Sequence, residues 1–190
     1  MKVRESGMPE QEVWASFFDV SGILSKMEID SDVHDLIEIG FGYGTFTIPA
    51  AQRISGTIYA FDIEQEMAVV AGKEIRANGI NNVHLEIRDV LEQGTGLEEA
   101  QIDYIMLFNI LHLENPEVLL QEAFRVLKPG GKVGVIHWRS DISTPRGPDL
   151  DIRPTPEDIL DQFKTLPFAI HKLPFVIEPY HIGLIASKEM

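Results

Sequence analysis

Short apolar runs alternate with amphipathic stretches along most of the chain. The apolar runs are rich in β-branched and aromatic residues and are bounded by turn residues, so they predict strands. These strands cover residues 36–39, 57–62, 83–89, 102–109 and 132–138. Apolar residues at helical spacing predict helices over residues 45–53, 64–77 and 116–127. The alternation predicts an α/β fold with a doubly wound parallel sheet and right-handed crossovers.

The pattern changes after the fifth strand. Residues 139–156 hold several prolines and few apolar side chains, so we expect a long loop, and such loops are often functional. Thr155 and Pro156 occupy the N-cap and first position of a further helix. Two final strands separated by a short turn predict an antiparallel hairpin that closes the sheet, near residues 169–175 and 180–187.

The N-terminal segment is amphipathic. Residues 10–27 predict one helix, or two short ones broken near Ser21-Gly22. Apolar stripes of this kind usually pack on a core, which is the reading we favour. The other reading is that residues 1–28 form a helical lid over a ligand pocket, with Trp14 or Phe18 facing a substrate.

Composition narrows the function further. The chain of 190 residues carries a net charge of −14 and contains no cysteine. A surface this negative repels phosphate backbones, so we do not expect nucleic acid as a partner. We find no apolar run of transmembrane length and no signal peptide, and we assign no metal. We therefore expect a single cytoplasmic domain over residues 1–190, without membrane insertion, as a monomer or homodimer.

A glycine-rich turn follows the first predicted strand. Gly40, Gly42 and Gly44 stand at alternate positions, and a helix begins directly after them. Glycines let a backbone approach a ligand closely, and the free N–H groups of a helix start favour an anionic group. The dinucleotide pattern G-x-G-x-x-G would require a third glycine where this chain has Thr45.

Four motifs in order resemble the class I S-adenosylmethionine-dependent methyltransferases, in particular the ubiquinone/menaquinone-biosynthesis type (methyltransferase type 11). The resemblance covers residues 35–139, and the motifs lie at the expected strand ends. They are Glu38-x-Gly-x-Gly-x-Gly44, Asp62, Arg88-Asp-Val90, and Phe108–Leu113 followed by Leu127-Lys-Pro-Gly-Gly131. The resemblance implies a Rossmann-like, three-layer fold with a mostly parallel seven-stranded sheet in the order 3-2-1-4-5-7-6, the last strand antiparallel.

The resemblance also implies a cofactor, S-adenosyl-L-methionine, with S-adenosyl-L-homocysteine as its product. The methionine end would lie on the glycine turn, with Glu38 near its amino group. The ribose would be held by Asp62, and the adenine amine by Asp89. The remaining implied cofactor contacts come from the turn, from the residues after two strands and from the path to the methyl group: Gly40, Phe41, Gly42, Gly44, Thr45, Ile63, Val90 and Asn109.

The residues that would act on the acceptor are less defined. His112 follows the fourth strand and is a candidate general base, although a merely polar or capping role is the favoured reading. His137 and Trp138 alternate on the fifth strand, so at most one of them faces the pocket. Arg139 and Arg146 are candidates for contact with the substrate.

Several functions stay open on these residues alone. The leading hypothesis is methyl transfer to an unidentified small molecule. We expect no separate substrate domain, so selectivity would come from residues 1–28, the loop of residues 139–156 and the region after His112. A non-catalytic S-adenosylmethionine-binding module and an NAD-dependent dinucleotide-binding domain are the alternatives, and protein methylation is a minor one. A carbon-5 cytosine methylation mechanism is excluded, since it needs a cysteine nucleophile.

Overall fold

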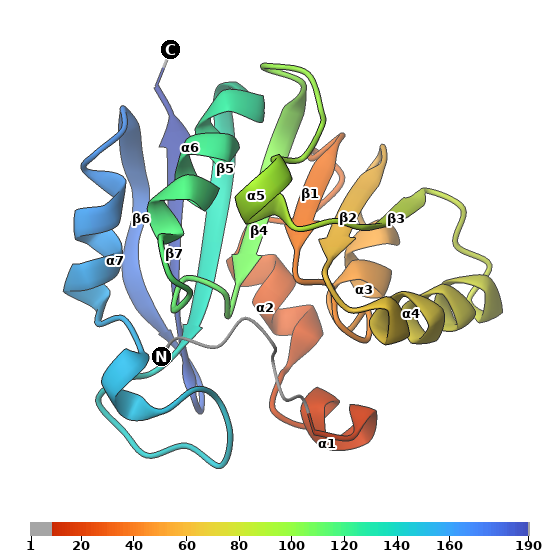
Figure 1. Ribbon diagram of the computed structural model, residues 1–190, viewed down its shortest axis with the longest axis horizontal. Helices are drawn as coiled ribbons and strands as arrows, with labels where there is room; N and C mark the ends of the chain where they lie inside the picture. The colour runs from red at the N-terminus through yellow and green to blue at the C-terminus, as the bar shows by residue number, and fades with distance from the viewer. Residues whose placement is uncertain (1–8, 190) are drawn as a thin grey trace.

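The computed structural model describes residues 9–189, and these build one mixed β-sheet with helices on both faces (Figure 1). The seven strands lie in the order β3-β2-β1-β4-β5-β7-β6, which confirms the expected order. All neighbours pair in parallel except β5–β7 and β6–β7. The strands are β1 (Leu36–Ile39), β2 (Ile58–Asp62), β3 (Val83–Ile87), β4 (Ile102–Phe108), β5 (Leu127–Trp138), β6 (Phe168–Ile177) and β7 (His181–Lys188).

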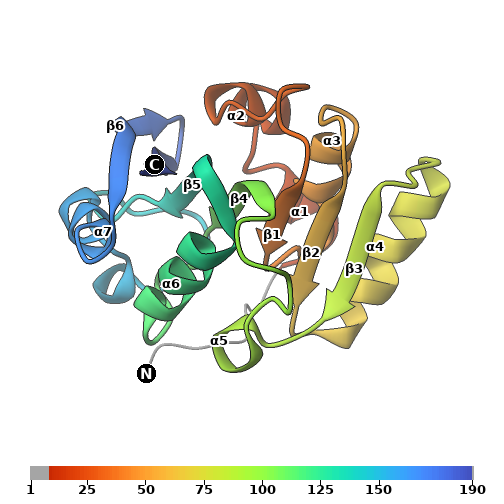
Figure 2. The same ribbon diagram turned by 90° about the horizontal axis from the view of Figure 1, so that it is seen from above.

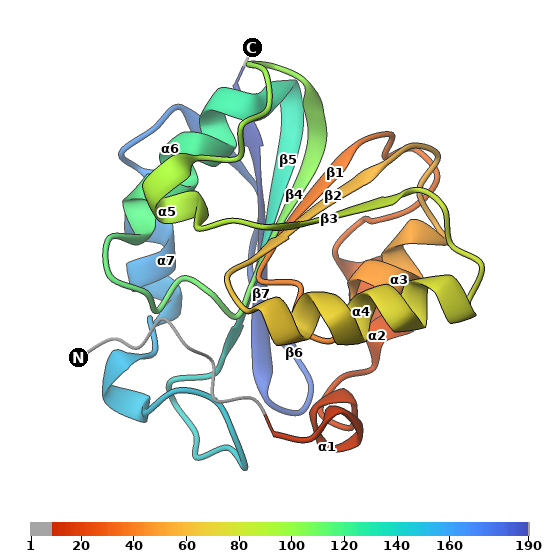
Figure 3. The ribbon, with the colours of Figure 1, turned by 45° about the vertical axis from the view of Figure 1, so that its right-hand side comes forward.

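The helices form the outer two layers. One face of the sheet is covered by α2, α3 and α4, and the other by α5, α6 and α7 (Figures 2 and 3). Helix α1 lies at the edge where the parallel strands end, beside the loop of residues 139–156 (Figure 1). The helices are α1 (Gln11–Ala15), α2 (Val20–Lys26), α3 (Thr47–Ala51), α4 (Gln65–Ala77), α5 (Val90–Gln93), α6 (Pro116–Val126), α7 (Pro156–Phe163) and the 3-10 turn η1 (Leu150–Ile152).

Two apolar clusters, one on each face of the sheet, hold the layers together. Every residue of β1 is buried, as expected for a central strand covered by helices on both faces. Tyr104 in β4 is fully buried, and its hydroxyl donates to the carbonyl of Met27 at 2.7 Å. Gly134 on the neighbouring strand makes room for that hydroxyl, because a Cβ there would lie 2.1 Å from it. No helix among the described residues is long and apolar enough to cross a membrane.

The break in the N-terminal segment was predicted at the wrong place. The chain leaves the helical conformation between α1 and α2, whereas Ser21 and Gly22 lie inside α2. The carboxylate of Asp19 caps α2 by accepting a hydrogen bond from Gly22 N at 3.1 Å. A Cβ at Gly22 would lie 2.3 Å from that carboxylate. The glycine therefore accommodates the cap and does not end the helix.

The start of β5 was also predicted too late. The turn of residues 128–131 does end α6, but it lies within β5 and does not precede it. Leu127 pairs with Ile102 and Lys132 with Tyr104, so four residues bulge out opposite Asp103. Lys128 in this bulge donates to the Asp103 carboxylate at 2.8 Å.

The predictions for the C-terminal part are confirmed. Thr155 caps α7 in a capping box, in which its hydroxyl accepts from Asp158 N and the Asp158 carboxylate accepts from Thr155 N. Strands β6 and β7 pair antiparallel across a short turn at Glu178-Pro179. The hairpin places β7 against β5, which brings His181 beside Trp138.

Candidate active site

A pocket of about 280 Å³ opens at the carboxyl edge of the parallel strands. The turns after β1, β2, β3 and β4 form one part of its wall, and α1, the loop of residues 139–156 and single residues of neighbouring helices and of β5 contribute the rest. Ten of the candidate residues line it: Trp14, Gly40, Gly42, Asp62, Ile63, Asp89, Val90, Asn109, His112 and Arg146. Seven candidates do not: Phe18, Glu38, Phe41, Gly44, Thr45, His137 and Arg139.

The glycine turn is bound to the second strand. Gly40 N donates to the carbonyl of Phe61 at 2.7 Å, which holds the start of the turn against β2. All three glycines have positive φ, +82° at Gly40, +52° at Gly42 and +79° at Gly44. A side chain in this conformation costs about 1–2 kcal/mol, so the turn needs glycine for its own geometry. Gly40 and Gly42 also contribute to the pocket wall, where no Cβ stands between the backbone and a ligand.

The carboxylate of Asp62 connects the turn to β2. One of its oxygens accepts from Gly42 N at 2.8 Å, and the other accepts from Glu64 N at 3.0 Å. Burial raises the pKa of Asp62, and the two backbone hydrogen bonds oppose that rise. Each carboxylate oxygen has a second acceptor position. The group is therefore oriented by backbone and able to bind a pair of hydroxyls from a ligand.

Glu38 lies behind the turn and outside the pocket wall. It is 3% exposed and accepts a short hydrogen bond from the Thr47 hydroxyl in α3. Burial raises its pKa to about 8, and the nearby charge of Asp62 adds to the rise. Its carboxyl group is therefore mostly protonated at neutral pH. This position makes Glu38 a support of the glycine turn and not a residue of the pocket surface.

The turn after β3 combines an acid with an apolar wall. Asp89 caps α5 by accepting from Leu91 N at 3.0 Å, and Val90 beside it is buried. Ile63, which follows β2, is 40% exposed at the pocket. A flat apolar group can lie between Ile63 and Val90, with the Asp89 carboxylate at its polar edge.

Asn109 also lines the pocket. It follows β4 with φ of +57°, in the left-handed region that asparagine tolerates better than most residues. Its N–H donates to the carbonyl of Ile136 at 2.7 Å, which fixes the backbone. The side-chain oxygen is buried and has no hydrogen-bond partner among the described residues. A buried acceptor of this kind beside a pocket is a candidate for ligand contact.

Aromatic side chains form another part of the pocket wall. Trp14 and Trp138 both line the pocket, with ring centroids 6.3 Å apart. Phe18 lies deeper, packed against Trp14 and Phe46 at 5.0 and 5.1 Å. Of the two lid candidates, the structure therefore places Trp14 at the pocket and Phe18 in the core.

Two histidines meet where β4 and β5 end. The Nδ1 atom of His112, at the pocket, lies 3.3 Å from the Nε2 atom of His137. The Nδ1 atom of His137 lies 3.1 Å from its neighbouring backbone carbonyl, that of Trp138. Burial lowers the pKa of His137 to about 3, so it is neutral. Strand alternation placed Trp138 on the pocket side and His137 behind it.

The loop of residues 139–156 is organised by Arg153, which is 8% exposed. Its guanidinium donates to three backbone carbonyls, those of Pro148 at 2.7 Å, Arg139 at 2.9 Å and Arg146 at 3.2 Å. Arg153 therefore holds the loop through its backbone carbonyls. Arg139 pairs with the exposed Asp141, which leaves Arg146 as the loop arginine at the pocket.

Sequence reasoning missed several wall residues. They come from the segment before α1, from the strand ends and the turns after them, from α4, α5 and α6, and from the loop: Pro9, Ile39, Phe61, Glu64, Met67, Arg88, Leu91, Phe108, Ile110, Leu113, Leu119, Trp138, Gly147, Pro148 and Ile152. Phe61, which precedes Asp62, could have been found by extending the motif by one residue, and Arg88 stands within a motif but was not assigned a contact. The loop residues carry no such signal.

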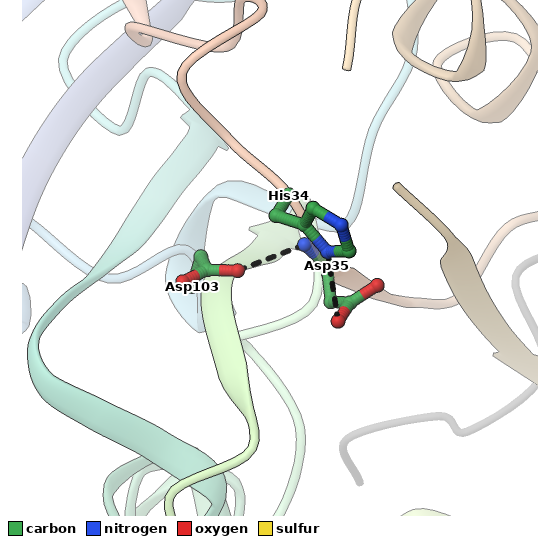
Figure 4. Close-up of side chains that lie close together, drawn as sticks. All are labelled: His34, Asp35 and Asp103. Atoms are coloured by element: carbon green, nitrogen blue, oxygen red, sulfur yellow. Dashed lines mark hydrogen bonds and ion pairs between the residues drawn. The ribbon is translucent and has the colours of Figure 1, made fainter. Parts of the chain in front are cut away.

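A second polar cluster lies at the other end of β1 and β4 and is separate from the pocket. His34 approaches Asp35 at 3.1 Å, and Asp35 N donates to Asp103 at 2.9 Å (Figure 4). Asp35 also accepts from Thr57 N, and Asp103 accepts from Lys128. Because these carboxylates already tie together the starts of three strands, we read the cluster as a structural clamp.

Comparison with known proteins agrees with this geometry. A family model described as a methyltransferase domain matches residues 36–131. An uncharacterised protein of Methanocaldococcus jannaschii is 30% identical over 141 residues, which are 70% of this chain and 60% of that protein. A demethylmenaquinone methyltransferase of Lactobacillus johnsonii is 30% identical over 123 residues, 61% of this chain and 47% of that enzyme. The chain thus spans about half the length of these curated relatives.

Solved structures share the fold. A SAM-dependent methyltransferase from Aquifex aeolicus superposes with a TM-score of 0.80 over 90% of both chains, at 20% identity. A cyclase superposes with a TM-score of 0.76 over 98% of this chain and 84% of its own, at 16% identity. The sheet order, the glycine turn and the family match lead to one assignment. This chain belongs to the class I S-adenosylmethionine-dependent methyltransferases.

Proposed function

We propose that the chain binds S-adenosyl-L-methionine in the pocket at the carboxyl edge and transfers its methyl group to a small-molecule acceptor. The observation that carries the proposal is the hydrogen bond from Gly42 N to the Asp62 carboxylate at the pocket wall. This hydrogen bond fixes the glycine turn relative to the Asp62 carboxylate. A nucleoside with a charged tail can then contact both groups at once without reordering them.

The pocket residues fit the parts of this cofactor. Asp62 would accept from the ribose hydroxyls, and Ile63 and Val90 would enclose the adenine, with Asp89 accepting from its amine. The turn at Gly40 and Gly42 would lie against the methionine end, where a Cβ would intrude. The orphaned side-chain oxygen of Asn109 supplies a buried acceptor beside these groups. When bound, the cofactor supplies an electrophilic methyl group on a sulfonium.

The acceptor would occupy the part of the pocket walled by Trp14 and Trp138. A pocket of about 280 Å³ is of a size that suits small molecules. We infer that the N-terminal segment acts as a lid, because Pro9 and Trp14 belong to the wall. Residues 1–8 of that lid lie outside the described residues. Transfer then depends mainly on proximity and on the exclusion of water.

A thermal-shift comparison tests the cofactor. S-adenosyl-L-homocysteine should raise the midpoint of unfolding, and the shift should grow with the logarithm of its concentration once that exceeds Kd, whereas NAD should give no shift. A shift with NAD alone would favour the dinucleotide-binding reading and contradict the proposal.

Binding alone does not establish transfer, since one structural neighbour with this fold is a cyclase. The second arm therefore supplies S-adenosyl-L-methionine with a tritiated methyl group and follows label into small molecules of a cell extract. Labelled small molecules support the proposal. A midpoint shift without any labelled product would identify a binding module.

A further inference from the structure

We propose that the methyl acceptor is a small monocarboxylic acid and that the guanidinium group of Arg146 holds its carboxylate at the pocket wall. The proposal rests on the proposed function, because it names the class of acceptor that the same pocket would take. Three observations carry it: the place of Arg146 in the wall, the fixed backbone around it, and a side chain that no described residue neutralises.

The backbone that carries Arg146 is held from behind. Its carbonyl accepts from the Thr144 hydroxyl and from the Arg153 guanidinium, the latter at 3.2 Å. The Pro148 carbonyl accepts from the same guanidinium at 2.7 Å. Because Arg153 is only 8% exposed, these charge-assisted bonds form where water hardly competes for them. The segment of residues 146–148 is therefore an ordered part of the pocket wall.

Gly147 lets this segment lie directly on the indole of Trp138. It has φ of +105°, and a Cβ there would lie 2.8 Å from the Trp138 ring. A side chain at this position would lift the segment off the ring, so the close approach requires glycine. Trp138 itself is 1% exposed and serves as the support for the segment. Arg146 is thereby presented at the part of the pocket that lies beside Trp138.

The charge of Arg146 has no partner among residues 9–189. Its side chain is exposed and forms no hydrogen bond or ion pair there. The other arginine of the pocket wall, Arg88, donates to Glu86 at 2.7 Å. Arg139 in the same loop pairs with Asp141. On a chain with a net charge of −14, a guanidinium left open at a pocket creates a local site for an anion.

The proposed function already assigns the other charged groups of the wall to the cofactor. Asp62 and Asp89 would hold the ribose and the adenine amine, and the turn at Gly40 and Gly42 would hold the methionine end. Arg146 comes instead from the loop that lies on Trp138, which belongs to the part of the pocket assigned to the acceptor. We therefore assign its charge to the acceptor and not to the carboxylate of the cofactor.

A single guanidinium suits a monoanion. A carboxylic acid is ionised at neutral pH, and its two oxygens match the guanidinium fork through two parallel hydrogen bonds. A phosphate monoester carries nearly two charges at this pH, and Asp62, Glu64 and Asp89 in the same wall would repel it more strongly. A carboxylate anchored at Arg146 fixes one end of the acceptor and so limits the orientations in which it meets the methyl group.

The class of the acceptor can be tested before its identity is known. The small-molecule fraction of a cell extract is divided into three portions. One is mock-treated, one is treated with carbodiimide and excess methylamine, which turns carboxylates into neutral amides, and one is treated with alkaline phosphatase. After removal of the reagents, each portion receives the full chain and S-adenosyl-L-methionine with a tritiated methyl group.

Labelled product should form in the mock-treated and phosphatase-treated portions and should fall by about tenfold or more in the amidated portion, because the charge that Arg146 holds is gone. Carbodiimide also activates phosphate groups, so the phosphatase-treated portion separates the two kinds of anion. A phosphorylated acceptor would lose its label in both treated portions, whereas a carboxylic acid loses it in the amidated portion alone.

Variants test the residue itself. At limiting extract, Arg146→Gln should lower the labelling rate by about 10- to 100-fold through the loss of a charge-assisted contact. Arg76→Gln is the matched control, because Arg76 is exposed near the end of α4, lies outside the pocket wall and carries the same charge. Arg146→Lys keeps the charge but loses the fork, so its rate should lie between those of the unmodified chain and Arg146→Gln. Calorimetry should give all three variants the unmodified affinity for S-adenosyl-L-homocysteine.

The outcomes separate the two levels of the proposal. Label that persists after amidation, or that disappears after phosphatase treatment, would overturn the carboxylic acid. Equal rates in Arg146→Gln and Arg76→Gln would remove Arg146 from the acceptor site. Weaker binding of S-adenosyl-L-homocysteine by Arg146→Gln would show that Arg146 holds the cofactor instead. By contrast, the absence of a midpoint shift with S-adenosyl-L-homocysteine, or of any label in the mock-treated portion, would contradict the proposed function itself.

Discussion

The hydroxyl of Thr47 donates a hydrogen bond to the carboxyl group of Glu38 in a place that solvent does not reach. The pair joins the first residue of α3 to the central strand, on opposite sides of the glycine turn. It is therefore a brace for the turn, and its cost is a carboxyl group whose pKa is raised to about 8 by burial.

This raised pKa makes stability depend on pH. Between the unfolded pKa of 4.5 and the folded pKa of about 8, the folded state holds a proton that the unfolded state has lost. The free energy of unfolding should therefore fall as pH rises through this window, by up to about 1.4 kcal/mol per unit from Glu38 alone. Urea unfolding from pH 5 to 8 should show a flatter profile in Glu38→Gln. Parallel profiles would contradict the assignment.

The glycine turn allows a matched pair of substitutions. Gly40 and Gly79 both have positive φ, +82° and +64°, so alanine should cost each a similar backbone strain of about 1–2 kcal/mol. A Cβ at Gly40 would meet Ile110 at an ordinary 3.5 Å, and a Cβ at Gly79 would meet nothing within 4 Å. Only Gly40 lines the pocket.

Gly40→Ala should therefore weaken the binding of S-adenosyl-L-homocysteine by about tenfold or more, a loss of about 1.4 kcal/mol, whereas Gly79→Ala should not. Isothermal titration calorimetry measures both affinities, and the unfolding midpoints verify that the two strains match. Equal affinities in the two variants would mean that the turn does not touch the ligand.

Asp62 provides a test of the ribose contact. Asp62→Ala should weaken binding of S-adenosyl-L-homocysteine by about 1–3 kcal/mol, through the loss of charge-assisted hydrogen bonds. Asp161→Ala on α7 is the control, since that side chain is 67% exposed and lies outside the pocket wall. Calorimetry that gives the same affinity for both variants would remove Asp62 from the binding site.

Arg153 should control the order of the loop beside the pocket. Lysine cannot reach three carbonyls with one ammonium group, so Arg153→Lys should lose charge-assisted bonds worth about 1.5–3 kcal/mol each. Hydrogen exchange of residues 139–149 should accelerate in this variant. Arg139→Lys, which alters only a pair with the exposed Asp141, should leave exchange unchanged. Equal protection in both variants would refute this role.

The periodicity of the sequence was sufficient for the sheet, because strands buried on both faces read as continuous apolar runs and the motifs follow their carboxyl ends. The rules that read glycine as a helix breaker or a turn residue were less reliable, because contacts with other residues decide the local conformation. Gly22 looks like a helix breaker, but its missing side chain makes room for the Asp19 cap. Gly130 and Gly131 look like a turn before a strand, but they bulge within one.

The candidate site was only partly predictable. Residues adjacent to a glycine or acid motif, such as Asp62 and Val90, could be named because the rule for strand ends fixes their position. The contact between His112 and His137 depends on the register of β4 and β5 and on two side-chain rotamers. The three carbonyl partners of Arg153 depend on a loop path that no periodic pattern encodes. Both sets of contacts form only when segments distant in the sequence meet in the fold.

The bond from Tyr104 to the Met27 carbonyl has a mechanical consequence. It fastens the far end of α2 to the middle of the sheet, and the neighbouring Glu28 is held again by Lys132 at 2.8 Å. Helix α2 is thus held firmly against the sheet. Helix α1 contains no buried residue and connects to α2 through residues 16–19. We therefore expect the proposed lid to open by a rotation of α1 about residues 16–19.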